Sequence, residues 1–174
     1  MATVTKRIEP HRRLGLSSTP MMNIEQATSF TGKKGDPVFI DGSGQIRASE
    51  TTGTTTGYQI AQVSESGLIA GFLTEDGASG DSVKIGFVPA LPGMMFKGQL
   101  VETTTGSLHV LAQTDVGASM GLVKFSGDTH YGVNTTPGSG NECVKVVELI
   151  DPVGTTGGMV GFVVNAEWRQ LDLG

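Results

Sequence analysis

The stretch that decides the fold is Gly35-Asp36-Pro37-Val38-Phe39-Ile40-Asp41-Gly42-Ser43-Gly44-Gln45-Ile46-Arg47-Ala48-Ser49. Two apolar runs flank a glycine-rich turn, which is the pattern of a β-hairpin. In a strand, alternate side chains share a face. The sequence therefore predicts strands over residues 36–40 and 45–49, with Val38, Ile40, Ile46 and Ala48 on one face.

The same kind of signal recurs along the chain. Residues 81–88 alternate, so that Val83, Ile85 and Phe87 are expected to face inward and Lys84 outward. Further strands are expected over residues 58–63, 67–73, 94–101, 108–113, 121–125, 142–150 and 159–166, and a single helical turn over residues 115–119. Roughly nine or ten short strands at near-regular spacing predict a barrel or a sandwich.

Composition supports the same class. The 174 residues include 26 glycines and several runs of threonine, and only 37% are apolar. Glycine weakens helices and supplies turns, whereas threonine suits strands. We expect one all-β domain over residues 32–174, a small Gly/Thr-rich β-barrel or β-tulip/sandwich of short antiparallel strands.

Charge is distributed unevenly. Residues 1–34 carry six basic and two acidic side chains, or +4, which leaves −9 for the other 140 residues within a net charge of −5. Residues 1–31 contain Pro10 and Pro20 and have no sustained apolar period, although residues 23–29 could form a short helical turn. We interpret residues 1–31 as an extended basic arm that docks on an acidic partner. The alternative is a frayed terminus without a role.

The side chains expected to make these partner contacts are basic or apolar. They are Arg7, Ile8, Arg12, Arg13, Leu14, Leu16, Met21 and Met22. The basic cluster lacks interleaved aromatic residues and is attached to an acidic body, which disfavours nucleic acid as the partner.

Residues with catalytic or ligand chemistry are few. His11, His109 and His130 lack metal-ligand spacing, and Cys143 lies beside valines, as expected of a small buried hydrophobic residue. No apolar stretch reaches the length of a membrane span. The sequence therefore predicts a non-enzymatic protein without cofactor, metal or membrane partner.

The hairpin residues 35–48, the run Gly80-Asp81-Ser82-Val83-Lys84-Ile85 and the ending over residues 159–173 with Trp168 resemble the capsid decoration, or cement, proteins of tailed bacteriophages. The resemblance implies a small β-barrel or β-tulip domain that forms a homotrimer on the outer face of a shell of HK97-type major capsid protein. It also implies an N-terminal arm that crosses neighbouring capsomers, and no catalytic residues. Such a protein is made in the host cytoplasm and ends on the outer surface of the virion.

Two other classes remain open from the sequence. A tail-tube, head-fibre or spike component would share the Gly/Thr-rich β composition. A carbohydrate-binding β-sandwich would need accessible aromatic side chains, for which Tyr58, Tyr131 and Trp168 are the candidates besides phenylalanine.

Overall fold

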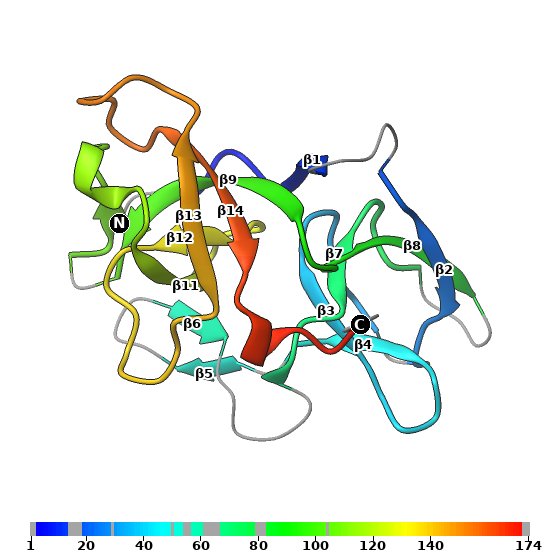
Figure 1. The fold of residues 1–174 in the computed structure, drawn as a ribbon. Coiled ribbons are helices and arrows are strands. Elements are labelled where there is room, and N and C mark those ends of the chain that lie inside the picture. Colours follow the sequence, from blue (N-terminus) through cyan, green and yellow to red (C-terminus); the bar gives the residue numbers. More distant parts are fainter. Residues whose placement is uncertain are drawn as a thin grey trace.

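The computed structural model describes residues 3–13, 19–28, 30–49, 51–53, 57–60, 67–78, 83–103 and 105–171. Fourteen strands in these ranges form two sheets, which lie side by side (Figure 1). The described residues contain no α-helix and two short 3-10 helices, η2 (Gln113–Asp115) and η3 (Ala166–Trp168). The all-β class predicted from the sequence is confirmed.

The nine-stranded sheet contains β1 (Glu9–Arg13), β5 (Thr51–Gly53), β6 (Gly57–Ile60), β9 (Met94–Glu102), β10 (Ser107–Leu108), β11 (Ser119–Phe125), β12 (Gly132–Asn134), β13 (Val144–Leu149) and β14 (Met159–Val164). Five of these strands pair in a closed ring, in the order β9, β14, β13, β11, β12 and back to β9. The β12–β9 pair is parallel, against the expectation of antiparallel strands throughout. Closure of the ring satisfies the backbone groups that an open sheet would leave at its edges.

The five-stranded sheet has the order β2 (Met22–Glu25), β8 (Lys84–Pro89), β7 (Gly71–Leu73), β3 (Pro37–Ile40) and β4 (Ile46–Ala48). The β3–β4 pair is the hairpin expected from the sequence, with Val38 opposite Ala48 and Ile40 opposite Ile46. Gln26, just after β2, forms an isolated bridge with Ile46 at the other edge. This sheet therefore also curls toward closure.

Hydrophobic packing joins the two sheets. The Phe72 ring of β7 lies 4.5 Å from the Phe96 ring of β9 and 6.0 Å from the Phe162 ring of β14, measured between centroids. Near the C-terminal end of the chain, Gln170 exchanges hydrogen bonds with both backbone polar groups of Ile40, and Leu171 packs against the cores of both sheets. The two sheets therefore form one packed body.

The N-terminal segment belongs to this body, which differs from the extended arm expected over residues 1–31. β1 pairs with one edge of β9 and β2 pairs with β8. Val4 and Ile8 are each only 2% exposed. The prediction that residues 23–29 could form a short helical turn is wrong, because residues 22–25 form β2.

Gly35 lets Ile8 approach the body closely, and Gly98 leaves room for Val133 and Phe162 beside β9. A Cβ atom at Gly98 of β9 would lie 3.5 Å from Cγ1 of Ile8 and closer still to Val133 and Phe162. Gly35 has a φ of 88°, and a Cβ atom there would lie 2.7 Å from the Ile8 carbonyl oxygen. A larger residue at Gly35 would push the N-terminal segment away from the core, whereas one at Gly98 would first press on Val133 and Phe162.

Candidate functional site

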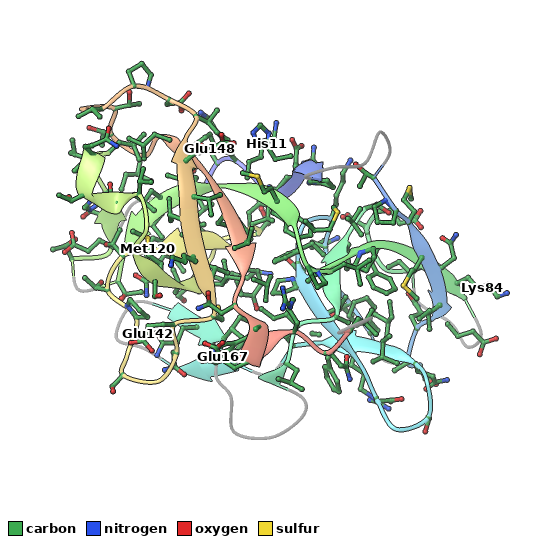
Figure 2. The ribbon with its side chains drawn as sticks, in the orientation of Figure 1. His11, Lys84, Met120, Glu142, Glu148 and Glu167 are labelled. Carbon is green, nitrogen blue, oxygen red and sulfur yellow. The ribbon has the colours of Figure 1, made fainter. Side chains whose placement is uncertain are left out.

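The basic charges expected to contact an acidic partner are in part neutralised within the chain. Lys6 Nζ lies 3.7 Å from Asp151 Oδ2, and Lys97 and Arg7 both lie near Glu9, at 3.1 and 3.6 Å. Figure 2 shows His11 and Glu148 next to each other, with His11 Nε2 2.7 Å from Glu148 Oε1. Lys6 and His11 of the N-terminal segment therefore contact acidic residues of the body, whereas Glu9, which lies in the same segment, pairs with Arg7 and with Lys97 of β9.

The residues predicted for partner contact are distributed differently from the expectation. Ile8 is a core residue, so its expected role as an anchor on a partner is corrected. Met21 is 60% exposed and Met22 is half-buried against the core of the five-stranded sheet. Arg7 is exposed. Leu14 and Leu16 lie outside the described residues, as do the side chains of Arg12 and Arg13.

Exposed aliphatic side chains gather at another place. Seven large hydrophobic residues are exposed in the described ranges, and five of them come from residues 110–116 and 147–153. They are Val110, Val116, Val147, Ile150 and Val153, which we call the aliphatic end. Isolated exposed apolar residues are common on protein surfaces, whereas a concentration of them marks an interaction surface.

Backbone hydrogen bonds bring the two segments of the aliphatic end together. The Leu111 N–H donates a hydrogen bond to the Thr155 carbonyl at 3.0 Å, and the Gly154 N–H donates one to the Leu111 carbonyl at 2.8 Å. Gly117 donates to the Val146 carbonyl of β13 at 2.8 Å. Figure 1 shows the β13–β14 loop beside the segment that carries η2, at the upper left.

Acidic side chains in these two segments bond within the chain. Asp115 is 7% exposed, accepts the Ala112 N–H at 2.8 Å and lies 3.4 Å from His109 Nε2. Asp151 accepts the Met159 N–H at 2.9 Å as well as pairing with Lys6. Gln113 and Thr114 are also exposed in these segments, so the surface combines polar side chains with five aliphatic ones, and the aliphatic side chains gain free energy when a partner covers them.

Sequence reasoning missed this surface. Val116 and Val153 lie in turns without an apolar neighbour, whereas Val110, Val147 and Ile150 lie in apolar runs that local rules interpret as buried strand. The signal that could have found part of it is the presence of Val116 and Val153 at turn positions, where polar residues are usual.

Within the described ranges, no group of three or more His, Cys, Asp or Glu side chains is placed to hold a metal ion. No helix of the described residues is long and apolar enough to cross a membrane. Comparison of the chain with protein-family models, with curated proteins and with solved structures finds no match in any of the three.

Cys143 is fully buried in the core of the nine-stranded sheet, as expected from its valine neighbours. Burial raises the pKa of its thiol to about 12. Because the thiolate is the reactive form, we expect the native protein to resist a chromogenic thiol reagent at about pH 8, and to react fully once denatured. Rapid reaction of the native protein would show that this part of the core opens readily.

Proposed function

We propose that this chain is a structural virion protein that binds the outer surface of a viral capsid and stabilises contacts between major capsid protein subunits. In this proposal the partner shell is built of HK97-type subunits, and the chain resides on the virion surface after synthesis in the host cytoplasm. The capsid partner comes from the resemblance of residues 35–48, 80–85 and 159–173 to decoration proteins.

The aliphatic end is the observation that carries the proposal. A cement protein needs a preformed surface that loses water when it docks, and five aliphatic residues held by β13, η2 and their connections supply one. Because this surface lies on a packed body, it loses little conformational entropy when it docks. A flexible arm would lose the conformational entropy of every residue that becomes ordered. We therefore assign the main capsid contact to the aliphatic end, with exposed Arg7 and Met21 as candidates for additional contacts.

The proposal includes a homotrimer on the shell. Only 17% of the residues are charged, which leaves much weakly charged polar surface for contacts between copies around a symmetry axis. Reconstruction of purified particles that contain the chain should show three copies around such an axis on the outer face. Single copies or two-fold pairs would contradict the trimer, and density within a tail tube, head fibre or spike would contradict decoration.

A further inference from the structure

A cavity of about 410 Å³ lies between the two sheets and is unrelated to the aliphatic end. The five-stranded sheet and its loops contribute Phe30, Asp36, Phe39 and Arg47, and the nine-stranded sheet contributes Lys124 of β11 and Tyr131. The volume falls within the range of about 300–1,000 Å³ that is usual for small-molecule sites.

Asp36 has one carboxylate oxygen without a hydrogen-bond partner among the described residues. The residue is 6% exposed, and its Oδ2 accepts the Lys33 N–H at 2.9 Å and lies 3.6 Å from Lys124 Nζ. The other oxygen, Oδ1, is buried and accepts no hydrogen bond. Burial raises the pKa of this carboxyl, which is consistent with an incompletely satisfied charge. A buried acceptor of this kind favours any ligand that donates a hydrogen bond.

The charges around the cavity are already balanced. Lys124 pairs with Asp36, and its ammonium also lies 5.5 Å from the centre of the Tyr131 ring. Arg47 pairs with Asp41. A charged ligand would bring an additional unpaired charge next to the largely buried Asp36–Lys124 pair, so the site favours a neutral donor.

Three aromatic side chains, those of Phe30, Phe39 and Tyr131, complete the lining. Apolar walls with a few polar groups are typical of sites for small molecules. The C–H faces of a sugar ring can pack on aromatic side chains, while its hydroxyls donate to a carboxylate and accept from arginine and lysine.

We propose that this cavity binds a neutral, hydroxyl-rich ligand the size of a single sugar unit, with one hydroxyl donating to the Asp36 carboxylate. The cavity shares no residue with the aliphatic end, so ligand binding here is independent of capsid attachment. Failure to bind a sugar would not contradict the proposed function.

The test is titration of the full chain with glucose, galactose, mannose and N-acetylglucosamine, each to about 50 mM, followed by saturation-transfer NMR. We expect at least one of these sugars to bind and Asp36→Ala to weaken its binding by about tenfold or more. Arg47→Gln changes an exposed side chain and should also weaken binding, which keeps the test decisive if Asp36→Ala fails to fold.

Asp76→Ala is the matched control. Asp76 also accepts a backbone N–H, from Lys34 at 2.8 Å, and pairs with a lysine, but it does not line the cavity. Sugar binding should be unchanged in this variant. The proposal is overturned if none of the four sugars binds, if Asp36→Ala and Arg47→Gln bind as tightly as the wild type, or if only a cation such as methylammonium binds.

Discussion

Removal of residues 1–13 should prevent the protein from folding stably. β1 pairs with one edge of β9 while β14 pairs with the other, so the deletion exposes the backbone groups of a central strand. It also removes Val4 and Ile8 from the core, and the hydrogen bonds that Asp128 and Gln99 accept from the N–H groups of Val4 and Thr5. The truncated chain should lose its cooperative unfolding transition in circular dichroism.

A point substitution separates packing from the loss of the strand. Ile8→Ala should lower the free energy of unfolding by about 2–5 kcal/mol, the usual cost of truncating a buried isoleucine. Met21→Ala, in the same N-terminal segment but 60% exposed, should change it by no more than about 0.5 kcal/mol. Urea unfolding of the two variants measures both values. Equal stability of Ile8→Ala and the wild type would contradict the placement of this segment in the core.

Charge placed on the aliphatic end should abolish capsid attachment and leave the fold intact. Val110 is 51% exposed and Val153 58% exposed, so aspartate at either position remains hydrated in the free protein. On the shell, the same carboxylates would be buried without partners, at a cost of about 1–3 kcal/mol each in addition to the lost apolar contact. The double variant Val110→Asp/Val153→Asp should therefore bind capsids at least about 100-fold more weakly.

Tyr58→Asp is the control for this experiment. Tyr58 is 55% exposed, which matches the exposure of the two valines. It lies on β6, away from the β13–β14 loop in Figure 1. This variant should co-sediment with capsids as the wild type does. If instead the double variant binds normally while Tyr58→Asp does not, capsid attachment occurs through another surface. Thermal unfolding of each variant verifies that the fold is retained.

The hairpin and the long strands could be predicted from the sequence because their signals are local. The glycine-rich turn after Ile40 identifies the β3–β4 hairpin, and the alternation around Ile85 and Phe87 identifies β8 with both side chains buried. β12 has three residues and could not be recognised on its own. It is nevertheless the strand that closes the ring between β11 and β9.

The N-terminal strands were missed because their partners are distant in sequence. Lys6 and His11 lie in a basic, proline-containing segment that local rules classify as an arm. Their ion-pair partners, however, are Asp151 and Glu148 near the other end of the sequence. The candidate sites were missed for the same reason. Neither the gathering of the exposed valines nor the approach of Lys124 to Asp36 leaves a local pattern, because both depend on how the sheets close.

Sedimentation with emptied capsids tests the central claim most directly. Capsids purified from a virus lysate that contains the chain are stripped of it, mixed with increasing amounts of the purified full-length protein, and pelleted. The account predicts that the protein pellets with the shells and saturates at a fixed ratio to the major capsid protein, whereas the Val110→Asp/Val153→Asp variant stays in solution. A wild-type protein that remains in the supernatant at every ratio would contradict the proposal that it is a capsid decoration protein.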